Sequence, residues 1–135
     1  MPDLRVIADT NFLMIPGLFG VDIFGELDRI TERKYRLLVP KPVVEELKEI
    51  AAEGGPRERS AARIALDILL LSGAEVVDIE PPADDAILKL AREHKYVVGT
   101  NDAKLRRKLR SNGIPVVYLR QKSHLSIDGG YNYKV

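Results

Sequence analysis

Short apolar, β-prone runs alternate with segments of helical periodicity along this chain, and no other feature constrains the fold as strongly. The β-prone runs cover residues 4–8, 35–39, 74–79, 96–99 and 115–119. Apolar residues at helical spacing predict helices from Val21 and over residues 42–52, 57–71, 84–94 and 102–111. Strands that alternate with helices form a parallel sheet covered on both faces. We therefore predict an α/β fold, a three-layer α/β/α sandwich around a mostly parallel five-stranded sheet.

The 135 residues allow one domain, which we expect over residues 1–125, followed by a C-terminal tail over residues 126–135. No apolar run approaches the roughly 18 residues of a membrane span, and the first residues do not read as a signal peptide. We therefore expect a cytoplasmic protein. The sequence has no cysteine, which excludes disulfides, a thiolate zinc site and a cysteine nucleophile.

Two acids directly follow predicted strands, and two others lie on apolar helix faces. Asp9 follows the first strand and Asp102 the fourth, so both should lie at the carboxyl edge of the sheet. Glu46 shares a helix face with Val43, Leu47 and Ile50, and Asp84 shares one with Ile87, Leu88 and Ala91. Because a carboxylate aimed at the core is costly unless it is paired or bound to a metal, we expect both to point inward at a site.

Each acid also has a simpler interpretation, which stays open at this point. Asp84 and Asp102 can cap the helices that they precede, and Asp9 can be an ordinary turn residue. Glu46 can lie at the edge of its apolar stripe or pair with an arginine.

Together, four carboxylates at one edge of a sheet would repel one another, and a divalent cation removes that repulsion. Oxygen ligands favour Mg²⁺ or Mn²⁺ over zinc. Such a site suits hydrolysis of phosphodiester bonds by a metal-activated water. The sequence has no Gly-rich phosphate loop, no G-x-S-x-G elbow and no credible Ser-His-Asp triad.

The distribution of charge favours an anionic partner. Residues 1–91 carry 11 Lys and Arg against 17 Asp and Glu, whereas residues 92–122 carry 9 against 2. We expect RNA phosphates to be held by seven basic residues: Lys104, Arg106, Arg107, Lys108, Arg110, Arg120 and Lys122. Tyr118 adds a weaker indication of base stacking. The alternative is that the basic helix simply presents a polar outer face to solvent.

In four stretches, the sequence resembles PIN-domain nucleases. These are V-I-A-D-T-N at Asp9, P-V-V-E-E-L at Glu46, A-D-D-A-I-L at Asp84 and V-V-G-T-N-D at Asp102. The run T-N-D-A-K-L-R-R-K-L-R and the stretch G-I-P-V-V-Y-L are similar to the Fcf1/Utp24-like branch of that family.

The resemblance implies a PIN-like domain with Mg²⁺- or Mn²⁺-dependent endoribonuclease activity and Asp9, Glu46, Asp84 and Asp102 as catalytic metal ligands. It implies that Asn11, Thr100 and Asp85 orient the pocket behind those ligands. Structured RNA, with precursor rRNA in a pre-ribosomal particle, and a homodimer are the implied partners. The alternatives are a VapC-type toxin acting on tRNA or rRNA, and an RNA-binding scaffold that keeps the acids without turnover.

Overall fold

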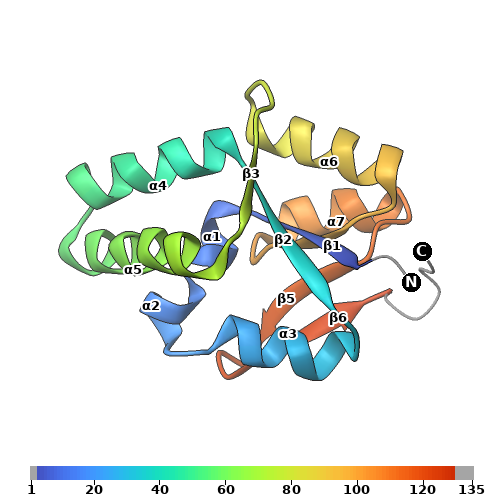
Figure 1. Ribbon diagram of the computed structural model, residues 1–135, viewed down its shortest axis with the longest axis horizontal. Coiled ribbons are helices and arrows are strands. Elements are labelled where there is room, and N and C mark those ends of the chain that lie inside the picture. The colour runs from blue at the N-terminus through green and yellow to red at the C-terminus, as the bar shows by residue number, and fades with distance from the viewer. Residues whose placement is uncertain (1–2, 130–135) are drawn as a thin grey trace.

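The computed structural model describes residues 3–129, which form a six-stranded sheet in the order β3-β2-β1-β4-β5-β6 (Figure 1). Neighbouring strands among the first five pair in parallel, and β6 pairs with β5 in antiparallel fashion. The α/β prediction is therefore confirmed. The strands are β1 (Leu4–Ala8), β2 (Tyr35–Pro40), β3 (Glu75–Val77), β4 (Val97–Gly99), β5 (Val116–Arg120) and β6 (His124–Asp128).

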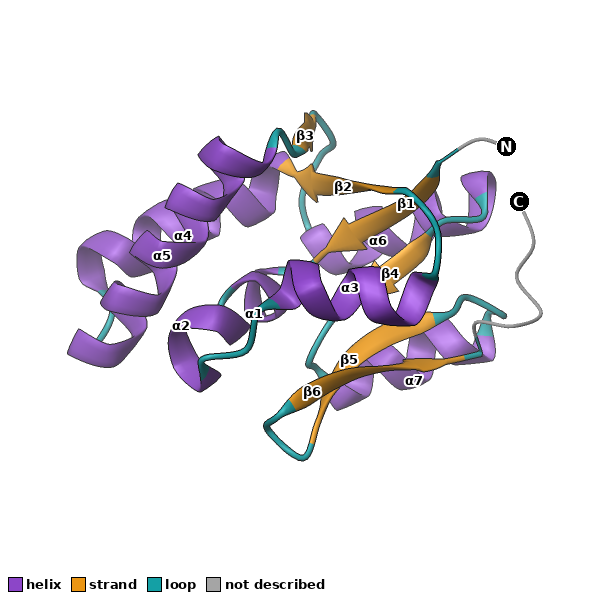
Figure 2. Ribbon diagram, turned by 60° about the horizontal axis from the view of Figure 1, so that its bottom comes forward, coloured by secondary structure: helices purple, strands orange, loops and turns teal. Residues whose placement is uncertain are grey.

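Helices cover both faces of this sheet, as Figure 2 shows with α3 in front and α6 and α7 behind. Alternate strand residues face opposite layers, so Val6 packs with α1 to α5 while Ile7 packs with α6 and α7. Between residues 3 and 129, no helix combines the length and the apolar character that a membrane crossing requires. The helices are α1 (Thr10–Leu13), α2 (Ile15–Phe19), α3 (Ile23–Thr31), α4 (Lys41–Glu53), α5 (Pro56–Ser72), α6 (Ala83–His94) and α7 (Ala103–Ser111).

The sixth strand corrects the prediction of a five-stranded sheet and spans the position at which we expect the domain to end. β6 runs to Asp128, so a boundary at residue 125 falls inside a strand. The strand was missed because an edge strand of five residues buries little apolar surface. Leu125 is buried and Ile127 is half-buried, which is too short a pattern for periodicity to detect. The rest of the expected tail, residues 130–135, lies outside the described residues.

The segment around Pro16 and Gly17 forms the short helix α2, although proline and glycine are typical of loops. Proline is tolerated in the first turn of a helix because its missing N–H is not needed there. Gly17 lets α2 approach α5 closely, since a Cβ at this position would lie 2.5 Å from the Cα of Ala61. Pro16 therefore lies within the first turn of α2, and Gly17 allows the close contact between α2 and α5.

Gly99 ends β4 immediately before the polar residues of the candidate site. A Cβ on Gly99 would lie 2.9–3.0 Å from three carbon atoms of the fully buried Phe12 ring. We expect Gly99→Ala to lower the free energy of unfolding by about 1–3 kcal/mol, the usual cost of overpacking a core. Urea denaturation measures this, and adding Phe12→Leu should recover part of the loss. A double variant whose loss equals the sum of the single losses would contradict this contact.

Candidate active site

Asp9 lies at the carboxyl end of β1 and is the most buried of the predicted site acids. The residue is 7% exposed, and both carboxylate oxygens accept hydrogen bonds. The backbone N–H of Thr10 donates to Oδ1 over 2.7 Å, which caps α1. The hydroxyl of Thr100 donates to Oδ2 over 2.9 Å. Asp9 is thus a helix cap and, at the same time, a fixed buried carboxylate.

Thr100 and Asn11 join the carboxyl ends of β1 and β4 into one polar network. The Thr100 hydroxyl is fully buried and accepts the backbone N–H of Asp102 over 3.1 Å. It also lies 3.3 Å from Oδ1 of Asn11, which accepts the backbone N–H of Asn101 over 2.7 Å. Both residues therefore connect the ends of β1 and β4, and Thr100 fixes one carboxylate oxygen of Asp9.

Burial is the largest influence on the pKa of Asp9 and raises it above the ordinary value of 3.8. The hydrogen bonds from Thr100 and Thr10 oppose this by stabilising the charged form. The negative charges of Asp84 and Glu46 raise the pKa further. Carboxylates from α4 and α6 therefore act on Asp9 at the end of β1, although they are far from it in the sequence.

Glu46 and Asp84 are both exposed, so neither carboxylate is buried with the apolar stripe of its helix. Their apolar neighbours behave as predicted, since Val43 and Leu47 in α4 and Ile87 in α6 are buried. The buried stripe of each helix is narrower than its apolar periodicity suggests, which leaves the acid at the edge in solvent. Pro82, rather than Asp84, occupies the N-cap of α6.

Asp102 caps α7, as the simpler interpretation held. Its Oδ1 accepts the backbone N–H groups of Lys104 over 2.9 Å and Leu105 over 3.3 Å. The residue is half-buried and is linked to Asp9 through Thr100. Asp102 therefore has one carboxylate oxygen committed to a helix while it lies in the same polar network as Asp9.

Asp85 pairs with Lys108 and forms no hydrogen bond or ion pair with the described residues around Asp9. It is exposed, and its Oδ1 lies 3.4 Å from Nζ of Lys108 on α7. This ion pair links α6 to α7, whereas the pocket around Asp9 is oriented by Thr100 and Asn11. The two aspartates of the A-D-D motif therefore have different neighbours, because successive residues of a helix point about 100° apart.

The chemistry of the acids fits an oxygen-preferring divalent cation. A buried carboxylate with two acidic neighbours acting on it gains stability when a cation neutralises the group. Glu46 and Asp84 are exposed and make no ion pair with residues 3–129. In that part of the chain, no three His, Cys, Asp or Glu side chains lie close enough to hold a metal ion as they stand.

The seven predicted RNA-binding residues divide into two groups. Within residues 3–129, ion pairs engage Arg106 and Arg110, each 3.3 Å from Asp128, and Lys108, which pairs with Asp85. The exposed residues without an ion pair to the described acids are Lys104, Arg107, Arg120 and Lys122. Sequence reasoning missed the role of Asp128, although it is the one acid in the sequence after Asp102.

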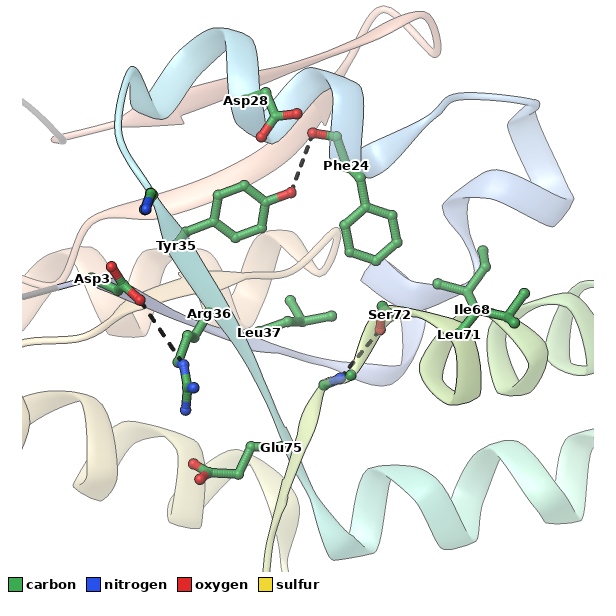
Figure 3. Close-up of a pocket in the computed structure, with 13 residues that line it drawn as sticks. Asp3, Phe24, Asp28, Tyr35, Arg36, Leu37, Ile68, Leu71, Ser72 and Glu75 are labelled. Atoms are coloured by element: carbon green, nitrogen blue, oxygen red, sulfur yellow. Dashed lines mark hydrogen bonds and ion pairs between the residues drawn. The ribbon is translucent and has the colours of Figure 1, made fainter.

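Two hollows flank the sheet at opposite edges. A depression of about 370 Å³ lies beside Asp102, between residues 100–103 and 118–121 and with Arg106 in its lining. A larger hollow of about 800 Å³, shown in Figure 3, lies where β2 and β3 begin and is lined by Tyr35, Arg36 and Glu75. The hydroxyl of Tyr35 donates to the carbonyl of Phe24 there, and Arg36 pairs with Asp3. The acidic site is therefore not in the larger hollow.

The structure thus combines a mostly parallel, helix-covered sheet with Asp9 and Asp102 at the carboxyl ends of its strands. The family model described as "PIN like domain" matches residues 6–122. This chain belongs to the PIN-like domain family, and the resemblance seen in the sequence is confirmed.

Its relatives include both kinds of protein that the sequence suggested. It is 31% identical to ribonuclease VapC4 of Methanocaldococcus jannaschii over 127 residues, covering 93% of this chain and 97% of the relative. It is 32% identical to the rRNA-processing protein FCF1 of Saccharomyces cerevisiae, covering 86% of this chain and 60% of FCF1. Among solved structures, the PIN domain endonuclease Utp24 matches with a TM-score of 0.73 at 29% identity, covering 92% and 90% of the two chains.

Proposed function

We propose that this protein is a divalent-cation-dependent endoribonuclease whose active site is formed by Asp9, Glu46, Asp84 and Asp102. The observation that carries the proposal is the buried Asp9, whose pKa is raised by burial and by the charges of Asp84 and Glu46. Membership of the PIN-like domain family and relatives that are named ribonucleases support the same activity.

In this proposal, the four acids would hold Mg²⁺ or Mn²⁺, and the ion would supply a water of lowered pKa and charge stabilisation at the scissile phosphate. Asp9 is the fixed ligand because Thr10 and Thr100 already orient both of its oxygens. Glu46 and Asp84 are exposed and complete the site from α4 and α6. Lys104 and Arg107, on the first two turns of α7, attract the phosphates on either side.

Structured RNA, with precursor rRNA in a pre-ribosomal particle, is the substrate that we propose first. The likeness to FCF1 and to Utp24 supports it. A VapC-type activity on tRNA or rRNA is the second candidate, because the match to VapC4 spans 97% of that relative against 60% of FCF1. Cleavage of a precursor rRNA fragment and of a tRNA at equal concentration distinguishes the two substrates.

Metal dependence is the direct test of the activity. We expect Mn²⁺ to raise the melting temperature of the wild type and to support RNA cleavage that EDTA abolishes, because a cation that binds only the folded state stabilises it. Thermal denaturation and a gel assay with labelled RNA measure the two effects. A wild type that binds RNA but neither binds Mn²⁺ nor cuts RNA would identify the RNA-binding scaffold instead.

A second copy of the chain remains the predicted protein partner. Leu70 and Leu71 on α5 are 83% and 88% exposed, which is unusual for two adjacent large apolar side chains. Size-exclusion chromatography with light scattering tests the homodimer.

We also propose that the protein is located in the cytoplasm.

A further inference from the structure

The depression beside Asp102 has the side chains of a nucleotide-binding site rather than those of a cation site. Its lining includes Arg106 and Arg120, the ring of Tyr118, and the polar residues Asn101 and Gln121. Asp102 is the one acid among the residues that line it. Guanidinium groups, an aromatic ring and amides are the groups that bind RNA phosphates and stack on bases.

Arg106 and Tyr118 form a preassembled stacking pair in this depression. The guanidinium carbon of Arg106 lies 3.6 Å from the centroid of the Tyr118 ring. Nε and Nη2 of Arg106 each lie 3.3 Å from Oδ2 of Asp128, which holds the guanidinium in place. The charge of Arg106 is therefore largely balanced within the fold, and its planar surface remains beside the ring for stacking.

Arg120 supplies a positive charge for a phosphate, whereas the charge of Arg106 is balanced by Asp128. It ends β5, lines the same depression and is exposed, and it makes no ion pair with the acids described between residues 3 and 129. The backbone N–H of Ser123 donates to the carbonyl of Arg120 over 3.2 Å and closes the turn that follows β5. A guanidinium that lies at a fixed strand end and that no described acid engages is suited to a phosphate.

We propose that this depression binds one unpaired nucleotide of RNA next to the phosphate held at the acidic site. The base stacks on the Tyr118–Arg106 pair, and Arg120 contacts the phosphate of that nucleotide. The proposal rests on the proposed ribonuclease function and adds to it a requirement for an unpaired base beside the cleaved bond. A substrate whose neighbouring base is held in a duplex cannot present its face to the pair, so it binds more weakly.

Binding of a fluorescent single-stranded RNA to the wild type in EDTA tests the subsite without cleavage. We expect Tyr118→Ala to weaken binding roughly tenfold, whereas Tyr118→Phe keeps the ring and binds as the wild type does. Arg120→Ala should reduce the salt slope of binding by about one. Lys34→Ala removes one positive charge from an exposed residue just before β2, at the opposite edge of the sheet, and should leave that slope unchanged.

The outcomes separate the subsite from the activity. If the wild type binds and cleaves RNA while Tyr118→Ala and Arg120→Ala bind as Lys34→Ala does, the depression is not a nucleotide site. If the wild type binds no RNA at all, the proposed function itself is wrong. Arg120 is exposed, so its variant stays informative even if Tyr118→Ala lowers the melting temperature.

Discussion

Asp9→Asn is expected to reduce RNA cleavage by roughly 100-fold or more and, in the absence of divalent cations, to raise the melting temperature. The loss of activity is on the scale of removing one preorganised electrostatic group from an active site. The gain in stability follows because burial penalises the charged form of Asp9, and Asp84 and Glu46 add repulsion. A neutral amide avoids both costs.

Asparagine also fits the hydrogen bonds around position 9. Its Oδ1 can accept the Thr10 N–H as the carboxylate does, and its Nδ2 can donate to the Thr100 hydroxyl. The Thr100 hydroxyl is then free to donate to Oδ1 of Asn11, which lies 3.3 Å away. The variant should therefore fold with its network intact, so that the loss of cleavage reports the missing charge.

The stability difference between Asp9→Asn and the wild type should depend on pH with a defined sign. The folded pKa of Asp9 is raised above the unfolded value of 3.8, so the folded state holds the proton more tightly. Wild-type stability contributed by this group is thus fully present below pH 3.8 and is lost as the pH rises through the folded pKa. Melting temperatures measured from pH 3 to 7 should show no gain for the variant at the acidic end and the full gain at neutral pH.

The paired Mn²⁺ titration distinguishes this interpretation from a merely structural one. Mn²⁺ should raise the melting temperature of the wild type and have little effect on Asp9→Asn, because the variant lacks the fixed ligand. An Asp9→Asn protein that cleaves RNA at the wild-type rate with Mn²⁺ would overturn the assignment of the site. Asp84→Asn provides a second variant with an exposed side chain, whose folding should be unaffected.

Thr100→Val is the substitution with the next largest expected effect. It keeps the shape of the side chain but removes a buried hydroxyl that donates to Asp9 and accepts from the Asp102 N–H. Both partners lose their hydrogen bond, so we expect a loss of about 1–3 kcal/mol in the free energy of unfolding. The pKa of Asp9 should rise further, because the Thr100 hydrogen bond is the largest influence that lowers it.

Cation affinity and cleavage should also fall by about 10–100-fold in Thr100→Val, since the group that orients the fixed ligand is gone. Calorimetric titration with Mn²⁺ and the gel assay measure the two quantities. Thr100→Ser keeps the hydroxyl and removes only a methyl group, so it should retain both. Equal Mn²⁺ affinity in the Val and Ser variants would show that Thr100 does not orient the ligand.

The local pattern of the chain was sufficient to predict most of the secondary structure. The first β-prone run coincides with β1, and the helices predicted over residues 42–52, 57–71 and 84–94 agree with α4, α5 and α6 to within one residue at each end. Apolar periodicity over several turns records which face of a helix is buried. The short segments α1, α2 and β6 were not predicted because so few residues carry no clear period.

The candidate site could be predicted in part from position along the chain. Acids that directly follow strands must lie at the carboxyl edge of a parallel sheet, which places Asp9 and Asp102. The periodicity that identified Glu46 and Asp84 could not show that both side chains lie in solvent, since the width of a buried stripe depends on the helix or sheet packed against it. The same limit explains Asp85, whose partner Lys108 lies on another helix.

The sequence by itself therefore determined most of the elements, a mostly parallel sheet and the edge at which Asp9 and Asp102 lie, because these depend on local periodicity and on strand polarity. Only the tertiary structure decided which side chains meet across the sheet. It tied Asp9 to Thr100, 91 positions away, and it set Arg106 between Tyr118 and Asp128. Such pairs form because packing brings distant segments together, and the periodicity of the sequence does not show which distant residues come into contact.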